Sequence, residues 1–214
     1  GHMYSGGDIA GIRRRLDYVQ ALGATALWMT PPVLNQWHDQ THGFWGYHGY
    51  WASHFKRMDP HVGSLDEYRQ LSDALHRRGM YLVQDVVVNH TANFFSYGAD
   101  WRADKPARGY RPNSGSRPDP RPLQPPFDLN DPRRAADRAA AIYHWTPEIR
   151  DVTVRDEELN FQTSGLDDIN TECPRARRAL RDSFGYWIRE VGVDAFRIDT
   201  AYHVPPEYFE DFLF

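Results

Sequence analysis

Three short apolar runs, each preceded by a segment with helical periodicity, constrain the fold of this chain more than any other feature. The runs are ATALWMTPPV at 24–33, MYLVQDVVVNH at 80–90 and VDAFRIDTAYH at 193–203. Strands that are apolar on both faces and separated by helices pair in parallel, with the helices covering the sheet. The order therefore predicts an α/β fold, and it fits a (β/α)8 barrel or a doubly wound sheet equally well.

Helices are predicted before each run and after the last one, because apolar residues recur there at helical spacing. Ser64 and Glu67 have the spacing of a capping box, and glycines stand where three of the helices should end. The predicted helices cover residues 8–22, 64–78, 174–191 and 205–214.

Residues 91–169 do not continue this alternation of helices and strands. Pro, Arg, Asp and Gly dominate ADKPARGYRPNSGSRPDPRPLQPPFDLNDP, and the segment is too long for an ordinary connection. We therefore expect a functional excursion at 91–169 that interrupts one α/β domain, made of residues 4–90 and 170–214. Residues 1–3, Gly-His-Met, are typical of the remnant of a cleaved tag.

Charge and hydropathy narrow the classes of partner. The formal net charge of −4 gives no electrostatic reason to expect nucleic acid or an anionic membrane surface. No apolar run reaches the length of a membrane span. The single cysteine, Cys173, excludes an internal disulfide.

The third apolar run contains a charged pair where only apolar side chains are expected. Alternation along a strand places Arg197 and Asp199 on one face, with Phe196 and Ile198 on the other. We expect the apolar pair to pack against helices and the charged pair to face the interior, with Arg197 keeping Asp199 ionised. Such a carboxylate can act as a nucleophile. A purely structural ion pair is the equally weighted alternative.

The second run ends in the same manner. Asp85 and Asn89 share one face of the strand, His90 lies just past it, and His203 holds the matching position after the third run. Because the carboxyl ends of parallel strands meet at one edge of a sheet, these side chains predict a pocket. The alternative for the two histidines is a hydrogen bond to a nearby main-chain carbonyl.

An aromatic, glycine-rich loop, HGFWGYHGYW, occupies residues 42–51. Flat rings beside carboxylates suit the C–H faces of sugars, so we expect Tyr50 and Trp51 to bind substrate; a hydrophobic plug is the alternative. His38, His42 and His48 lie in the same region. A loop of this composition does not hold them on one helical face, so zinc is not expected.

Five motifs in this order resemble the α-amylase superfamily of glycoside hydrolases. They are GGDIAGIRRRLDYVQALGATALWMTPPV, YHGYW, DVVVNH, LDDIN and DAFRIDTAYH. The resemblance runs from about residue 6 to the end and is weakest at 95–160. It implies part of a (β/α)8 TIM barrel, strands two to four only, with a domain B-like excursion after strand three. It also implies retaining hydrolysis, or transfer, of α-glucosidic bonds.

The resemblance assigns roles one residue at a time. Asp199 matches the family nucleophile, Arg197 the arginine beside it, and Asp85 the supporting aspartate of strand three. Tyr50 and His90 match the residues that hold the sugar at the cleavage subsite. Tyr202 and His203 match positions that face the leaving group, and many members carry lysine in place of Tyr202.

Calcium is the one cofactor that the resemblance implies. Asn89 and Asp168 match side chains that bind a structural calcium ion in many amylases, and the main-chain carbonyl of His203 completes that set. Hard oxygen donors suit this ion, although several branches of the family lack it.

The second carboxyl group of a retaining glycosidase, the general acid, should lie about 5–5.5 Å from the nucleophile. In the family this acid is a glutamate after strand five. Glu207, Glu210 and Asp211 fall in the last predicted helix and are poorly placed to replace it. We therefore expect the chain to be a fragment of a longer enzyme and to be inactive alone.

The leading expectation is an enzyme that hydrolyses α-1,4 bonds in starch-type glucans or maltodextrins, with secretion or a periplasmic location favoured by the resemblance. An α-glucanotransferase stays open, because water or a sugar hydroxyl can attack the intermediate. A non-catalytic sugar-binding or partner subunit is the alternative of another class, and the joint presence of Asp199, Arg197 and His90 argues against it. A nucleotide-binding protein is disfavoured because no glycine-rich phosphate loop follows any strand.

Overall fold

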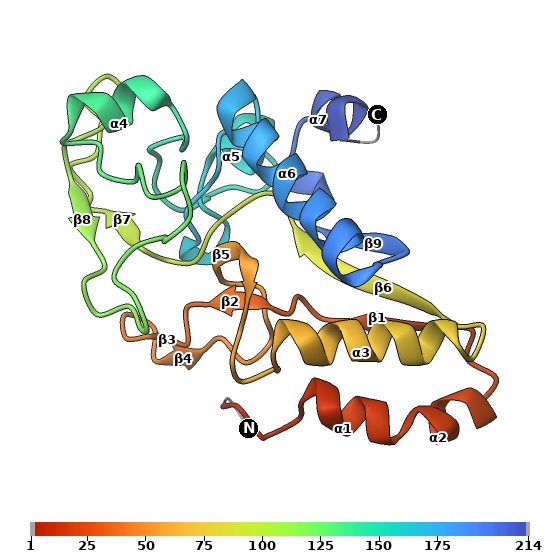
Figure 1. Ribbon diagram of the computed structural model, residues 1–214. Coiled ribbons are helices and arrows are strands. Elements are labelled where there is room, and N and C mark those ends of the chain that lie inside the picture. The colour runs from red at the N-terminus through yellow and green to blue at the C-terminus, as the bar shows by residue number, and fades with distance from the viewer. Residues whose placement is uncertain (1–2, 213–214) are drawn as a thin grey trace.

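A computed structural model describes residues 3–212 of the chain (Figure 1). At its centre is a three-stranded parallel sheet in the order β1-β6-β9, made of β1 (Ala26–Met29), β6 (Tyr81–Val87) and β9 (Ala195–Asp199). These strands are the three apolar runs of the sequence. The parallel α/β arrangement predicted for them is thus confirmed.

Helices cover one face of this sheet. The helices α3 (Leu65–His76) and α6 (Pro174–Val191) contact each other and lie over the same side of the strands (Figure 1). On that side Leu82 of β6 is fully buried, and the Phe196 ring of β9 lies 5.9 Å from the Phe184 ring of α6. Burial of these apolar groups supplies the main stabilisation of the sheet.

The helices begin and end at the predicted capping residues, but one predicted helix is divided in two. The capping box of Ser64 and Glu67 opens α3, and Gly192 ends α6 with φ +77°. The single helix expected at 8–22 is divided into α1 (Ile9–Arg14) and α2 (Leu16–Ala21). The residue between them, Arg15, has φ −111° and ψ 9°, outside the helical region.

Antiparallel strands that the sequence did not predict lie between β1 and α3. The strand β2 (Val33–Asn35) pairs with β5 (Ala52–Met58), and β3 (His38–Asp39) pairs with β4 (Phe44–Trp45). Trp187 of α6, fully buried, donates from Nε1 to the Phe55 carbonyl at 2.9 Å. The aromatic loop is therefore part of a region that is tied to the core.

The excursion lies beyond the carboxyl end of β6 (Figure 1). Its elements are β7 (Phe95–Tyr97), β8 (Tyr110–Pro112), α4 (Ala135–Ala140), α5 (Arg155–Asn160) and the 3-10 turn η1 (Thr163–Gly165). A bridge between His90 and Asp168 joins its two ends, close to the predicted boundaries. A second 3-10 turn, η2 (Ala201–His203), follows β9 and leads to α7 (Pro206–Phe212).

The face of the sheet opposite the helices carries Trp28, Tyr81 and the charged residues Asp85 and Arg197. Trp28 and Tyr81 are 57% and 60% exposed there, while Asp85 is fully buried. No helix among residues 3–212 has the length and apolar character needed to cross a membrane.

Candidate active site

Asp85 is the buried centre of the charged cluster at the strand ends. Its carboxylate accepts hydrogen bonds from Trp28 Nε1 at 3.1 Å, from the Tyr50 hydroxyl at 3.0 Å and from an Arg197 terminal nitrogen at 3.0 Å. Burial raises the pKa of Asp85, and the bonds from Tyr50 and Arg197 offset only part of that rise. Three donors from three strands or loops thus converge on one acceptor.

Arg197 joins this buried carboxylate to a more accessible one. The same Arg197 nitrogen that contacts Asp85 lies 2.6 Å from Asp199 Oδ1, and the guanidinium carbon is 5.4 Å from the Trp28 ring centroid. The Asp199 side chain keeps 25% of its area exposed, whereas Asp85 has none. Asp199 is therefore the carboxylate of the pair that a ligand can reach.

His90 is held neutral behind the aromatic loop. Burial lowers the pKa of His90 to about 4, so the ring carries no charge near neutral pH. Its Nε2 lies 3.2 Å from the Tyr50 carbonyl, which can only accept, so Nε2 carries the proton. The Asn89 amide nitrogen lies 3.4 Å from the other ring nitrogen. The same loop residue, Tyr50, thus contacts His90 through its main chain and Asp85 through its side chain.

The residues predicted for the leaving-group side, Tyr202 and His203, contact the excursion. Tyr202, in η2, is 71% exposed, and the Arg155 guanidinium lies 5.3 Å from its ring centroid. His203 Nδ1 donates to the Glu158 carbonyl at 3.0 Å, so its alternative as a carbonyl partner is realised. Both residues are therefore held by α5 of the excursion. Trp51 follows Tyr50 and lines a separate hollow.

Asp168, predicted as a calcium ligand, is buried, and only one of its two carboxylate oxygens has a hydrogen-bond partner. Its Oδ2 lies 2.6 Å from His144 Nδ1, whereas Oδ1 is buried without any hydrogen-bond partner. Burial raises the pKa of Asp168 to about 6, and the Asn89 side chain is close enough to lower it. A buried carboxylate oxygen without a donor fits an oxygen-ligated cation.

The three histidines considered for zinc have separate partners. The His38 ring packs on Trp45, the His48 ring packs on Trp51, and His42 pairs with Asp39. Among residues 3–212, no three His, Cys, Asp or Glu side chains are arranged to hold a metal ion.

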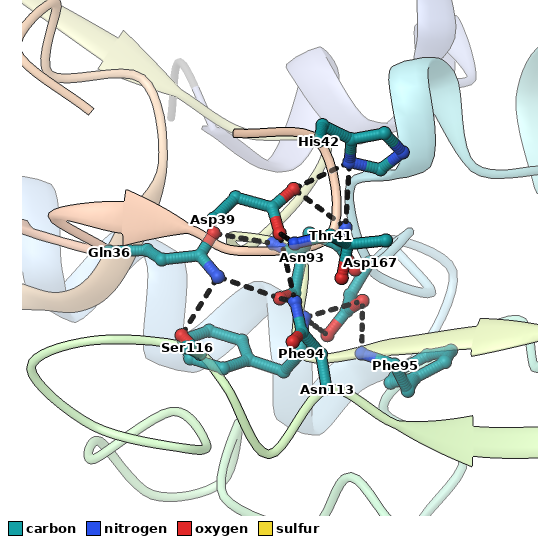
Figure 2. Close-up of polar contacts among 10 residues, drawn as sticks. All are labelled: Gln36, Asp39, Thr41, His42, Asn93, Phe94, Phe95, Asn113, Ser116 and Asp167. Carbon is teal, nitrogen blue, oxygen red and sulfur yellow. Dashed lines mark hydrogen bonds and ion pairs between the residues drawn. The ribbon is translucent and has the colours of Figure 1, made fainter. Parts of the chain in front are cut away.

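The sequence did not predict a polar network that joins the β3–β4 hairpin to the excursion by hydrogen bonds (Figure 2). Asp39 accepts from His42 at 2.6 Å, from the Thr41 amide at 2.8 Å and from Asn93 at 3.0 Å. Burial raises the pKa of Asp39, but these bonds outweigh it and hold that pKa below its ordinary value. Isolated Asp and Asn residues in loops are typical of solvated turns, so no sequence signal marked this network.

Asp167 is the second carboxyl group of the network. It is fully buried and accepts from the main-chain amides of Phe94 and Phe95 at 3.2 Å (Figure 2). Burial raises the pKa of Asp167 well above its ordinary value. Its neighbour in sequence, Asp168, was predicted as a ligand, and the motif gave no reason to separate their roles.

The charged cluster lies at the carboxyl end of parallel strands, which is where (β/α)8-barrel enzymes place their active sites. The fold and the position of the cluster therefore place the chain in the class of α/β proteins whose functional sites lie at the carboxyl ends of parallel strands. Comparison with known families is more specific. The chain belongs to the α-amylase family, because the family model described as alpha amylase, catalytic domain, matches residues 2–211.

Individual relatives agree with this assignment. An α-amylase of Streptomyces lividans is 33% identical over 96% of this chain and 25% of its own length. A cyclomaltodextrin glucanotransferase of Klebsiella oxytoca is 29% identical over 97% of this chain and 29% of its own. The crystal structure of an α-amylase from Geobacillus thermoleovorans, complexed with acarbose, superposes with a TM-score of 0.73 at 28% identity, over 99% of this chain and 38% of that one.

The chain thus spans a quarter to two-fifths of the length of these relatives. The predicted family and the predicted fold, part of a TIM barrel, are confirmed. The relatives include both hydrolases and a transferase, so the family-level activity is hydrolysis or transfer of α-glucan bonds.

Proposed function

We propose that this chain carries the nucleophile of a retaining α-glucan hydrolase, with Asp199 as that nucleophile. The observation that carries the proposal is the 2.6 Å contact between Arg197 and Asp199 at the carboxyl end of β9. Arg197 holds one Asp199 oxygen in place, and the exposed part of the Asp199 carboxylate can approach an anomeric carbon. The carboxylate oxygen forms a bond to that carbon as the bond to the leaving oxygen breaks.

Asp85 supports this arrangement and is not the acid. Its fully buried carboxylate is occupied by donors from Trp28, Tyr50 and Arg197, so it cannot reach a leaving oxygen. By fixing the guanidinium, it fixes the orientation of Asp199. Asp85 and Arg197 are therefore positioning residues in this proposal.

Tyr50 and His90 form the proposed wall for the sugar at the cleavage point. Because His90 is neutral and anchored on the Tyr50 carbonyl, the two rings hold one relative orientation. Trp51 extends the aromatic surface along the same loop, and Tyr202 with His203 faces the leaving group.

The general acid is proposed to come from a part of the enzyme outside these 214 residues. Two observations support this: the relatives are much longer than this chain, and Asp211 of α7 is bonded to Arg181 at 2.8 Å rather than to the site. Loss of a general acid costs about 10²–10⁴-fold in rate. The chain alone should therefore cleave natural glucans very slowly.

A structural calcium ion is part of the proposal. Asp168 through its unpartnered oxygen, the Asn89 side chain and the His203 carbonyl would hold it. Bound there, it would supply positive charge that links the excursion to the ends of β6 and β9.

A substrate that needs no acid tests the nucleophile directly. Fluoride leaves without protonation, so 5-fluoro-α-glucosyl fluoride should glucosylate the chain: the Asp199 carboxylate bonds to the anomeric carbon and fluoride departs with the electron pair. Mass spectrometry should locate the fluoroglucosyl group on the peptide that contains Asp199. Asp199→Asn should abolish labelling, and the control Asp182→Asn, at an exposed position of α6, should not. Labelling at another carboxylate would refute the assignment.

A transferase is the second candidate. The observation in its favour is the similarity to the Klebsiella oxytoca glucanotransferase, which covers 97% of this chain. Once a labelled intermediate is formed, the yield of transfer product (a disaccharide with added glucose, a trisaccharide with added maltose) against free sugar separates the two activities.

A further inference from the structure

Trp28 of β1 makes two contacts within the charged cluster, one through its ring nitrogen and one through its ring face. Its Nε1 donates to Asp85 Oδ2 at 3.1 Å, and its ring centroid lies 5.4 Å from the Arg197 guanidinium carbon. Asp85 and Arg197 also contact each other, at 3.0 Å. The three side chains therefore form a closed set in which each one touches the other two.

The strand register explains how a residue of β1 reaches both groups. Trp28 pairs with Val83 of β6, and Asp85 lies two residues further along that strand. Two residues span about 6.6 Å along a strand and the neighbouring strand is about 4.8 Å away, so an indole side chain covers the diagonal of about 8 Å. The strand β9 pairs with the other edge of β6 (Figure 1), so the Arg197 side chain lies across the central strand to reach the Trp28 ring.

The Trp28 ring supplies a restraint that the hydrogen bonds of Arg197 lack. Within residues 3–212, every hydrogen bond of the Arg197 side chain is made by one terminal nitrogen, Nη1, which contacts both Asp85 oxygens and Asp199 Oδ1. Bonds that meet at a single atom leave the guanidinium plane able to turn about that atom. A ring beside the guanidinium carbon opposes this turning, because the cation is attracted to the aromatic face.

We propose that Trp28 is a positioning residue for the Asp199 carboxylate and acts through the Arg197 guanidinium. The inference rests on the proposed role of Asp199 as the nucleophile. Arg197 Nη1 lies 2.6 Å from Asp199 Oδ1, so a guanidinium that turns takes this oxygen with it or releases it. A misplacement of about 1 Å in a reacting group can lower a rate by about 10²-fold. Trp28 should therefore affect the rate at which the glucosyl bond forms and not the binding of the sugar.

The rate of labelling by 5-fluoro-α-glucosyl fluoride measures this effect, because fluoride leaves without a general acid. The dependence of that rate on reagent concentration gives a binding constant for the sugar and a rate constant for bond formation. Trp28→Phe keeps a ring and removes the N–H donor, whereas Trp28→Leu removes both contacts. We expect the rate constant to fall about tenfold in Trp28→Phe and about a hundredfold in Trp28→Leu, with an unchanged binding constant.

Trp37→Phe is the matched control. The Trp37 Nε1 donates to the fully buried Asp59 carboxylate at 3.0 Å, so this variant loses the same kind of bond outside the cluster. In urea denaturation it should lose about as much stability as Trp28→Phe, and it should be labelled at the wild-type rate. Trp28 is 57% exposed, so Trp28→Phe keeps the test valid if Trp28→Leu does not fold.

Four results would overturn the inference, and only one of them also rejects the nucleophile. Labelling of Asp199 at the wild-type rate in Trp28→Phe and Trp28→Leu would show that Trp28 does not position the carboxylate. Weaker binding with an unchanged rate constant would show that Trp28 contacts the sugar instead. An equal loss of rate in Trp37→Phe would reduce the effect to lost stability. Absence of Asp199 labelling in the wild-type chain would reject the nucleophile, and the positioning role with it.

Discussion

Replacing Tyr50 with phenylalanine removes one hydroxyl from the charged cluster and leaves the ring in place. That hydroxyl donates at 3.0 Å to Asp85, which is fully buried. A hydrogen bond to a charged group contributes about 1.5–3 kcal/mol, against about 0.5–1.5 kcal/mol for one between neutral groups. We therefore expect Tyr50→Phe to lower the free energy of unfolding by about 2 kcal/mol at a pH above the folded pKa of Asp85, measured by urea denaturation.

The loss of stability caused by Tyr50→Phe should also depend on pH, and the ionisation of Asp85 determines whether that loss grows or shrinks as the pH rises. The pKa of Asp85 is raised in the folded state, so ionisation of this group disfavours folding, and the stability associated with its protonated form is lost as pH rises through that pKa. The Tyr50 bond opposes this loss only while Asp85 is ionised. The cost of Tyr50→Phe should therefore fall by about 1 kcal/mol when the pH is lowered below the folded pKa of Asp85, because the bond then joins neutral groups.

Tyr97→Phe is the matched control for this experiment. Its hydroxyl donates at 2.7 Å to the neutral carbonyl of Pro106. The control should cost about 1 kcal/mol at either pH. A Tyr50→Phe cost that equals the control, or that stays constant with pH, would refute the charge-assisted bond.

Two further predictions concern α6 and the Asp168 site. Gly185→Ala, inside α6, should raise the free energy of unfolding by about 0.5–1 kcal/mol, because its new Cβ meets only the movable end of Arg189. Gly192→Ala should lower the free energy of unfolding by about 1–2 kcal/mol, because φ is +77° there and a Cβ is strained in that region. Urea titrations in which both variants change the free energy of unfolding in the same direction would contradict this. Millimolar calcium should raise the melting temperature, as a ligand selective for the folded state does. Asp168→Ala should abolish that rise, and a rise that survives it would place the ion elsewhere.

The central sheet could be predicted because its three strands are short, mainly apolar runs that alternate with segments of helical periodicity. The antiparallel strand β5 could not, since its sequence, ASHFKRM, mixes charged and apolar residues without strict alternation. Its burial comes from tertiary contact with α6, through groups such as Trp187 and the Phe55 carbonyl. The break at Arg15 has no glycine or proline to mark it either.

The site could be predicted only where strand geometry brings residues together. Alternation and parallel pairing were sufficient to place Asp85, Arg197 and Asp199 in one cluster. His144, which contacts Asp168 at 2.6 Å, comes from a part of the excursion without periodicity, so its position depends on the fold of that segment.

The pairing of β6 with β9 sets Asp85 directly opposite Arg197. A slip of one residue would turn the guanidinium towards the helices, and a slip of two would move it about 6.6–6.8 Å along the strand, out of hydrogen-bond reach. The valines of β6 could accept several alignments almost equally well, since apolar contacts carry little directional information. The contact between Asp85 and Arg197 therefore also selects the register: the ion pair that orients the candidate nucleophile forms in only one pairing of the two strands.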